Sequence, residues 1–581
     1  MKRFVRNGLL YTGLACAALA LFSCGGGREI SREEAQMLQS GSLERLVAQT
    51  EQRPGGQGFS VGAVGGEWLT SITSDPKTFN TLVARDGDSR AVIDPLFEYL
   101  AEYDPYTREF IPNIASFRVE ADEAADSLRV VYTLRDDLYW TVPGQSPEDG
   151  VKVTTDDVVY WYNEIDGDPD LQLPAYPGQF IEMPDGSVKR VEIEKIDDRS
   201  FAFVFPRIIA NPVLSTNMAF GPRHIYQPAK EANGSAGVLD VFSVDTDVRT
   251  IPSLGMFHIV EYRQGIQVVL QRNPNYWKKD EAGTSYPYVE RVVYRILPDK
   301  NQEYLLFREG TRDSYSVRAE DLQDLLGVSD ADYTVLNGGQ SLGATFLTFN
   351  QNPANIDPVV HSWFSQTEFR QAMSCLLNRQ RIAEVVHRGL AEPALYFFAR
   401  ANPMFDPDIK LEYTYDPDRA VEILQSVGFY QDDQGVMHDT NGNVIEFSIT
   451  VGAENNQGID TCTIFADELQ RVGIQAQVRP VDFQALTEML LNTYDWQVVH
   501  VGLGANYWPE GGSNVWPSSG NFHLWHPLQE SPATEWEARV DSLYNRGRFS
   551  LDFDQRKAVY DEYQRLLLTE LPLLYTVQPL S

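Results

Sequence analysis

Positive charge is scarce in this chain of 581 residues. Lys and Arg number 48 against 82 Asp and Glu, which gives a formal net charge of −34 at pH 7. A surface this acidic repels phosphate backbones, so we expect no nucleic-acid partner. It also gives no electrostatic steering toward anionic ligands, whereas neutral, zwitterionic and cationic ligands are compatible with it.

Signatures of catalysis and of metal binding are missing as well. The sequence contains no HExxH, GxxxxGK[ST], GxSxG or CxxC motif. Among the eight histidines only His523 and His526 lie close together, and no Cys or clustered carboxylates accompany them. We therefore expect no enzyme activity, no cofactor and no metal. A secreted hydrolase stays as an alternative, which a recognisable nucleophile and base would favour.

Cysteine is rare, and one of the four cysteines lies in a targeting signal. A positively charged start and an apolar run over residues 8–22 are typical of an export signal, because the run is shorter than a membrane-spanning helix. Residues 21–25 then resemble a bacterial lipobox around Cys24. This predicts a signal peptide at 1–23, a lipid on Cys24 and a tether at 24–60. An ordinary signal peptide with an incidental Cys is the alternative.

The rest of the chain predicts a mixed α/β body. Runs of β-branched residues predict strands, and apolar residues at helical spacing predict helices. Strands are predicted at 129–134, 268–270 and 292–297, helices at 366–389, from Asp416 to Gly428 and around 559–567, and a β-α-β unit at 445–501. Cys375 lies in a predicted helix and is expected to pack as a small apolar side chain, while a disulfide with Cys462 stays open.

Six parts of this body carry short motifs in a fixed order. They are residues 95–100 with 103–104 and 110–115, 132–140, 153–160, 272–277, 369–379 and 415–420. In order and spacing, over nearly the whole mature chain, they resemble one family, the extracytoplasmic solute-binding proteins of peptide-type ABC transporters, which includes oligopeptide-, dipeptide- and nickel-binding members. Residues 141–149 are an insertion, and Asn378 stands where Asp is usual.

The resemblance implies an α/β fold of two lobes, with an extra subdomain in the first lobe and two hinge crossovers between the lobes. The expected first lobe is discontinuous. It comprises residues 60–97, 216–303 and 546–581, with the added subdomain at 98–215, and the second lobe is expected at 304–545. Ligand would be enclosed between the lobes by hinge bending, which suits a transport receptor.

Two stretches are expected to face the cleft by this resemblance. They supply Arg85, Asp86 and Gly87 on one side and Gly502, Leu503, Gly504, Asn506 and Tyr507 on the other. Peptide-binding members of the family carry Asp at the position of Asn506, where the carboxylate pairs with the peptide's α-amino group. An amide forms hydrogen bonds but cannot supply that charge pairing. A peptide bound by its free amino end is therefore in doubt.

An aromatic segment follows at residues 508–526. Three Trp, one Phe and two His alternate there with Asn, Ser and Gly. Flat apolar faces beside amide and hydroxyl groups suit sugar rings or aromatic side chains, although a surface loop held by its tryptophans explains the pattern equally well. We count Trp508, Glu510 and Trp516 as candidate ligand-binding residues. Glu510 would replace the missing Asp if it turned into the cleft.

These features predict a lipid-anchored, monomeric receptor of an ABC importer at the periplasm or the outer face of the cell membrane. The expected ligand is a peptide or a similar small polar oligomer, with an oligosaccharide as the alternative. The expected partner is a membrane permease. A sensor or adhesion lipoprotein that uses the same fold without a transporter remains an alternative of another class.

Overall fold

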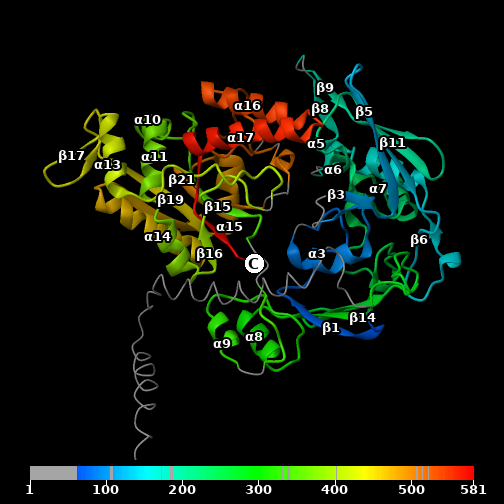
Figure 1. Ribbon diagram of the computed structural model, residues 1–581. Helices are drawn as coiled ribbons and strands as arrows, with labels where there is room; N and C mark the ends of the chain where they lie inside the picture. Colours follow the sequence, from blue (N-terminus) through cyan, green and yellow to red (C-terminus); the bar gives the residue numbers. More distant parts are fainter. Residues whose placement is uncertain are drawn as a thin grey trace, which may run out of the picture.

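The computed structural model describes residues 62–580 with short gaps. The gaps are residues 85, 105–108, 172, 174, 184, 186, 329–330, 337–339, 401, 454, 505–507, 513 and 521. The predicted signal peptide at 1–23, Cys24, the tether at 24–60, Arg85, Asn506 and Tyr507 therefore lie outside the described residues. Two lobes stand side by side in Figure 1, with the first lobe at the right and the second at the left.

The sheet of the first lobe joins strands that are far apart in the sequence. Its order is β1 (Gly65–Ile72), β14 (Val289–Ile296), β13 (Gln267–Arg272) and β12 (Phe257–Arg263). β1 runs parallel to β14, and the other neighbours are antiparallel. The strands predicted at 268–270 and 292–297 are thus confirmed as β13 and β14.

A second, antiparallel sheet lies within the residues expected to form the added subdomain. Its order is β10 (Glu192–Lys195), β11 (Ser200–Phe205), β5 (Ser127–Leu134) and β4 (Ala115–Asp122). β5 confirms the strand predicted at 129–134. Both sheets contribute to one core, which runs from Ile72 to Ile296 and includes Tyr132 and Phe203. The added sheet is therefore packed onto the first lobe rather than separate from it.

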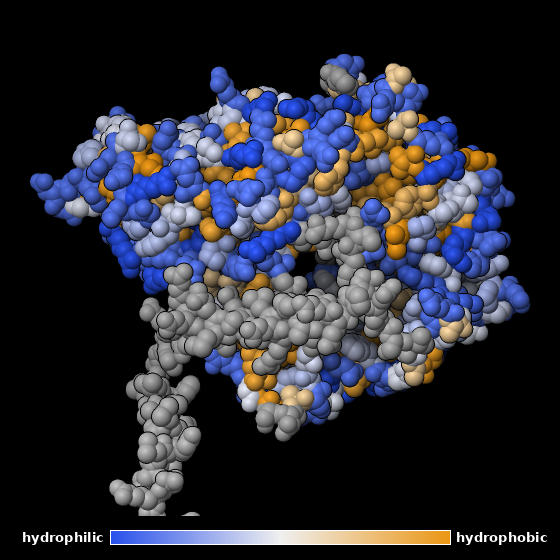
Figure 2. All heavy atoms as spheres, in the orientation of Figure 1, coloured by the Kyte–Doolittle hydropathy of each residue, from blue (hydrophilic) through white to orange (hydrophobic). Residues whose placement is uncertain are grey.

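Smaller elements complete the first lobe. They are α3 (Gly87–Ile93), β2 (Ala101–Asp104), β3 (Glu109–Pro112), β6 (Tyr139–Trp140), β7 (Val151–Lys152), α4 (Thr155–Tyr160), α5 (Ala175–Gly178), β8 (Phe180–Glu182), β9 (Val188–Arg190), α6 (Pro212–Thr216) and α7 (Arg223–Asp240). Figure 2 shows polar side chains over most of the visible face, with smaller apolar patches over both lobes.

The second lobe is built on a five-stranded mixed sheet. Its order is β20 (Gln475–Val481), β19 (Glu446–Gly452), β21 (Val498–Leu503), β15 (Ala344–Phe349) and β22 (Leu573–Tyr575). From β19 the chain passes through α14 (Asn456–Arg471) to β20 on one side. It then returns through α15 (Phe483–Glu488) to β21 on the other side. The carboxyl ends of the parallel strands β19 and β21 thus form a topological switch point, where open α/β sheets bind ligands.

The remaining elements of the second half are mostly helical. They are α8 (Lys300–Arg308), α9 (Leu322–Leu326), α10 (Pro358–Phe364), α11 (Thr367–Leu376), α12 (Arg379–Arg381), β16 (Ala391–Pro393), α13 (Pro417–Ser426), β17 (Tyr430–Gln431), β18 (Met437–His438), α16 (Glu535–Arg548), α17 (Phe553–Glu570) and β23 (Val577–Pro579). No helix among the described residues has the length and apolar character to cross a membrane.

Local signals place several of these helices correctly. Asp416 accepts a hydrogen bond from the Arg419 amide and caps α13, and Gly428 follows the helix with φ +91°. The helix predicted at 366–389 is interrupted, because α11 ends at Leu376 and Asn378 caps a new turn by accepting from the Arg381 amide. Cys375 and Cys462 are both buried and form no disulfide.

The C-terminal segment corrects the predicted domain boundaries. Residues 546–581 were expected in the first lobe, but β22 pairs with β15, and Tyr563 and Leu567 of α17 lie in the second core. The physical reason is that the apolar strand completes the edge of the second sheet. Between the two cores the described chain passes once, over residues 297–343, where the resemblance implies two crossovers.

Candidate functional site

A cavity of about 330 Å³ lies beyond the carboxyl end of β21. Eight aromatic side chains line it, and we call it the aromatic cavity: Phe346, Tyr396, Phe397, Phe398, Trp508, Trp516, Phe522 and Tyr575. The rings come from β15, β22, the segment after β16 and the segment after β21. The cavity is therefore a product of tertiary packing around the sheet edge.

Four of the predicted site residues line the aromatic cavity. They are Leu503, Gly504, Trp508 and Trp516. A short turn at Pro509–Gly512 positions the two tryptophans, because Gly512 lies so close to the Trp516 ring that a Cβ atom there would come within 2.3 Å of it. The tryptophan-rich segment thus forms a wall of a cavity, whereas its role in ligand binding remains a prediction.

The lining of the aromatic cavity is uncharged. None of its described residues is Asp, Glu, Lys, Arg or His, and the polar contributions include the amides of Asn402, Asn514 and Gln578. The Trp508 indole nitrogen is buried and has no hydrogen-bond partner in the described part of the chain. Burial also raises the pKa of Tyr575, which keeps its hydroxyl neutral. Such a surface favours neutral, flat groups over ions.

A second cavity of about 770 Å³ lies at the switch point and shares Leu503 and Phe522 with the first. We call it the switch-point cavity. Its lining includes Gly452 at the end of β19, Asn455 at the start of α14, and Gly502. Gly502 is thus the fifth predicted residue that borders a cavity. Four leucines and isolated polar groups complete a mostly apolar surface: Leu486, Leu490, Leu491 and Leu503 with Thr487 and His500.

His500 is the unusual group of the switch-point cavity. It is 3% exposed, and neither ring nitrogen has a hydrogen-bond partner in the described chain. Burial, together with the nearby His387, lowers the pKa of His500 to about 4. The imidazole is therefore neutral at pH 7 and offers one donor and one acceptor.

Glu510 was proposed to turn into the cleft and replace the missing Asp, but its carboxylate is bound by side chains of both lobes. Its carboxylate accepts hydrogen bonds from Arg556 Nη2 at 2.6 Å, from the Tyr560 hydroxyl at 3.1 Å and from Asn211 Nδ2 at 3.1 Å. In this arrangement its charge is balanced by Arg556. Glu510 therefore supplies no free negative charge to replace the missing Asp.

The first predicted stretch lies at the start of α3. Asp86 caps this helix by accepting hydrogen bonds from the Ser89 amide and hydroxyl, and Gly87 is the first helical residue. Neither residue lines the two cavities. Their predicted contact with ligand would require the lobes to meet across the cleft.

The two neighbouring histidines have structural surroundings. His523 is buried and contacts the Val515 carbonyl oxygen through Nδ1 at 2.9 Å, and burial lowers its pKa to about 4. Among the described residues no group of three or more His, Cys, Asp or Glu side chains is arranged to hold a metal ion.

Sequence reasoning missed one wall of the aromatic cavity. Tyr396, Phe397 and Phe398 follow β16, and Gln578 lies in β23, which pairs with β16. The three consecutive aromatic residues are visible in the sequence and could have been noted. That they lie in the same cavity as Trp508 and Trp516 could not be predicted, because it depends on pairing between strands nearly 200 residues apart, as between Glu392 and Gln578.

The chain belongs to the bacterial extracellular solute-binding proteins, family 5, whose middle region matches residues 109–523. It is therefore a solute-binding receptor of an ABC importer that works outside the cytoplasm, and the family is not enzymatic. These findings confirm the resemblance to peptide-type solute-binding proteins and the two-lobed α/β fold.

Individual relatives cover most of the chain at low identity. The "Probable ABC transporter-binding protein" of Deinococcus radiodurans is 25% identical over 88% of this chain and 86% of its own. The oligopeptide-binding protein AppA of Bacillus subtilis, solved with a nonapeptide, superposes with a TM-score of 0.66 at 19% identity, covering 90% of this chain and 94% of AppA. MelB of Agrobacterium fabrum, solved with stachyose, superposes with a TM-score of 0.69 at 19% identity, covering 90% of this chain and 80% of MelB. These likenesses establish the fold.

Proposed function

We propose that this receptor captures a peptide and seats one of its apolar or aromatic side chains in the aromatic cavity. The observation that carries the proposal is the lining of eight aromatic rings without a charged residue among those described. Such a lining binds through apolar contact and ring stacking. Peptide ligands are also named for two of the similar proteins, AppA of B. subtilis and a di/tripeptide-binding protein of Pseudomonas aeruginosa.

The volumes support a ligand of several units. The aromatic cavity, about 330 Å³, is at the small end of ligand pockets and suits one large side chain or ring. The adjoining switch-point cavity of about 770 Å³ has room for a neighbouring unit. In this proposal His500 and Asn455 recognise that unit by hydrogen bonds.

The mode of recognition differs from capture of a charged amino end. The aromatic cavity has no charged lining among the described residues, and Glu510 is paired with Arg556. Asn506, predicted in the family's carboxylate position, is an amide as well. We therefore expect blocked and free peptide amino ends to bind with similar affinity.

An oligosaccharide is the second candidate. Aromatic faces beside the amides of Asn402, Asn514 and Gln578 provide both the stacking surface and the hydrogen bonds that a sugar ring uses. MelB, which has a similar fold, was solved in complex with stachyose.

We further propose that a lipid on Cys24 holds the receptor at the membrane and that it delivers its ligand to an ABC permease. The lipobox-like residues 21–25 support the anchor. A Cys24→Ser variant should move from the membrane fraction to the soluble fraction, and retention of the variant in the membrane would contradict the anchor.

A thermal-shift panel tests the ligand class directly. The mature protein is screened against free and amino-acetylated peptides of two to nine residues and against neutral oligosaccharides. A ligand at 100 times its dissociation constant adds about 2.7 kcal/mol of stability. Stabilisation by both peptide forms supports the proposal, whereas stabilisation by sugars alone replaces it with the second candidate.

Asn506→Asp sharpens the same panel. A carboxylate at this position should strengthen binding of free amino ends relative to acetylated ones by about fivefold, since a charge-assisted hydrogen bond exceeds a neutral one by about 1 kcal/mol. An unchanged ratio would remove Asn506 from the site. Asn514→Asp is the matched control, because Asn514 lines the aromatic cavity in the described structure.

A further inference from the structure

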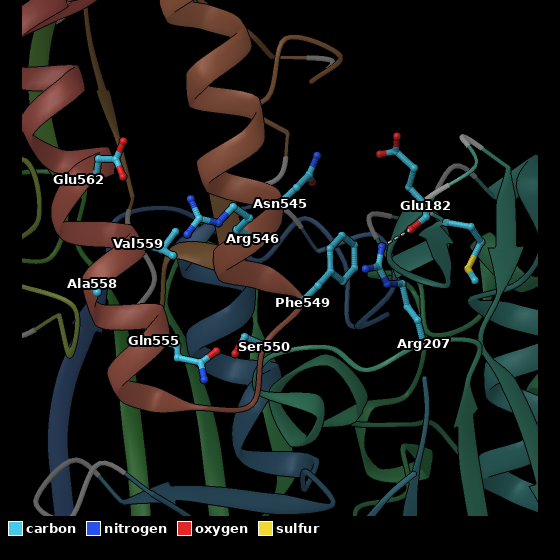
Figure 3. A pocket seen from close by; sticks show the side chains of 11 residues that line it. Glu182, Arg207, Asn545, Arg546, Phe549, Ser550, Gln555, Ala558, Val559 and Glu562 are labelled. Atoms are coloured by element: carbon cyan, nitrogen blue, oxygen red, sulfur yellow. Dashed lines mark hydrogen bonds between the residues drawn. The ribbon is translucent and has the colours of Figure 1, made fainter. Parts of the chain in front are cut away.

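The two lobes also touch on the side opposite the chain passage at 297–343, where α16 and α17 face the added subdomain (Figure 1). The Ala210 amide donates to the Arg548 carbonyl oxygen at 2.7 Å. Figure 3 shows Arg207 turned toward the Phe549 ring, and its guanidinium carbon lies 3.5 Å from the ring centroid. An open space of about 860 Å³ lies beside this contact. The Arg548–Glu182 ion pair at 3.8 Å also joins the lobes here, and Phe549 packs against the core of the first lobe, so side chains of both lobes form this contact.

A buried polar cluster lies behind this contact. Glu510 accepts from Arg556 and Tyr560 of α17 and from Asn211 of the first lobe. The side chains of Arg556 and Glu510 are only 4% and 13% exposed. A desolvated pair of this kind has a strongly preferred geometry, because each charge depends on the other. Asn211 is thus held across the interface by a rigid acceptor.

The same pair positions the wall of the aromatic cavity. The Arg556 guanidinium lies over the Trp508 ring, 5.2 Å from its centroid, in a cation–π contact. The Tyr544 hydroxyl donates to the Glu510 carbonyl oxygen at 3.0 Å and ties this turn to α16. Trp508, Arg556, Glu510 and Asn211 therefore form one chain of contacts from the cavity to the first lobe.

We propose that Arg556 and Glu510 are positioning residues that couple the aromatic cavity to closure of the lobes. The pair holds Trp508 in the cavity wall and at the same time holds Asn211 of the first lobe. A ligand that packs against Trp508 stabilises this one arrangement of the pair, and thereby the closed form. The proposal rests on the proposed function, since it assigns a regulatory role to the same cavity.

A double-mutant cycle on the unliganded protein tests the coupling. Trp508 and Asn211 share no hydrogen bond or ring contact in the described structure, so independent roles predict additive effects. Trp508→Leu removes the ring. Asn211→Gly removes the amide while tolerating the left-handed backbone, φ +48°, at this position. The closed-to-open ratio is measured by energy transfer between dyes on Lys189→Cys and Glu422→Cys.

Both labelling positions are exposed, and the labelled protein is prepared as the mature chain with Cys24→Ser, so that Cys375 and Cys462 are its native thiols. Burial raises the pKa of Cys375 to about 11 and of Cys462 to about 12, so neither forms the reactive thiolate at pH 7. We expect each single variant to lower the closed-to-open ratio. The double variant should depart from additivity by about fivefold or more, the lower end of usual coupling between sites. Additive effects, or an unchanged ratio in Asn211→Gly, would overturn the proposal.

Two further variants separate positioning from folding. Arg556→Lys keeps the charge opposite Glu510 and should retain part of the coupling, whereas Arg556→Gln combined with Glu510→Gln removes both charges together, leaves no unpaired buried charge, and should abolish the coupling. Equal coupling in both would overturn the role of Arg556. Arg539→Ala breaks the exposed Arg539–Glu562 pair between the same two helices and is the matched control without effect.

Adding candidate ligands to the labelled protein separates the test of the coupling from the test of the proposed ligand. The peptide Ala-Phe-Ala and stachyose are each added to the labelled wild-type protein. A shift toward closure by the peptide that is lost in Asn211→Gly supports both proposals. No shift with either compound counts against the proposed ligands, while the unliganded cycle still decides the coupling by itself.

Discussion

The two lobes use aromatic side chains for different purposes. In the first lobe Tyr132 stacks on Phe201 at 5.5 Å, and Tyr132 and Phe203 are fully buried between the added sheet and its helices. In the second lobe Tyr396, Trp508 and Phe522 are only half-buried and face a cavity. The difference teaches that a high aromatic content marks a binding surface only where packing leaves the rings a free face.

The largest effect is expected in the first lobe. Phe203→Ala should lower the free energy of unfolding by about 3–5 kcal/mol, because it leaves a void among Tyr132, Tyr162 and Phe201. Urea unfolding measures the loss. Ligand affinity per folded molecule should stay unchanged, and a matching drop in affinity would show that the two lobes do not divide these roles.

One buried histidine in each lobe makes the stability of the protein depend on pH, which allows the two lobes to be compared. Burial lowers the pKa of His258 in the first lobe and of His500 in the second to about 4. In the unfolded chain both histidines have a pKa near 6.5. Between about pH 6.5 and pH 4 they are therefore protonated in the unfolded chain but remain neutral in the folded protein. Stability is complete above about pH 6.5 and falls toward pH 4, by about 1.4 kcal/mol per pKa unit for each group.

His500→Leu should flatten this pH dependence without loss of stability at pH 7, because His500 has no hydrogen-bond partner among the described residues. His258→Leu should flatten it as well but cost about 1–3 kcal/mol at pH 7, since His258 contacts the Thr141 carbonyl oxygen at 3.0 Å. Unfolding midpoints between pH 7 and 4.5 provide the measurement. Equal losses in the two variants would contradict the contrast.

The smallest effect on stability is expected at the cavity wall. Tyr396→Ala should weaken binding of the best ligand of the panel by about two- to tenfold, since one ring contact contributes about 0.5–1.5 kcal/mol. Calorimetric titration measures the affinity. Tyr430→Ala removes an exposed tyrosine from the distant β17 strand and serves as the control (Figure 1). Similar losses in both variants would argue against binding in the aromatic cavity.

Local patterns predicted part of this structure well. Alternating and β-branched residues identified β5, β13 and β14, and Asp416 with Gly428 marked the ends of α13. β20 was not predicted, because it is an edge strand whose side chains are mostly exposed and form no apolar run. The break after Leu376 escaped notice because apolar spacing continues across it while the backbone does not.

The sequence identified one wall of the aromatic cavity. Leu503, Gly504, Trp508 and Trp516 were named from the sequence and do line one cavity. The opposite wall was missed, because it is brought there by pairing of β16 with β23 and of β15 with β22. The same long-range pairing placed the C-terminal strand in the second lobe.

The sequence alone determined the acidic charge and the order of the family's segments. These properties depend only on which residues occur and in what order. Tertiary structure decided which aromatic rings are core and which line a cavity, and it paired Glu510 with Arg556 rather than leaving it free. The reason is that a side chain's partners are set by the packing of distant segments, which local patterns do not specify.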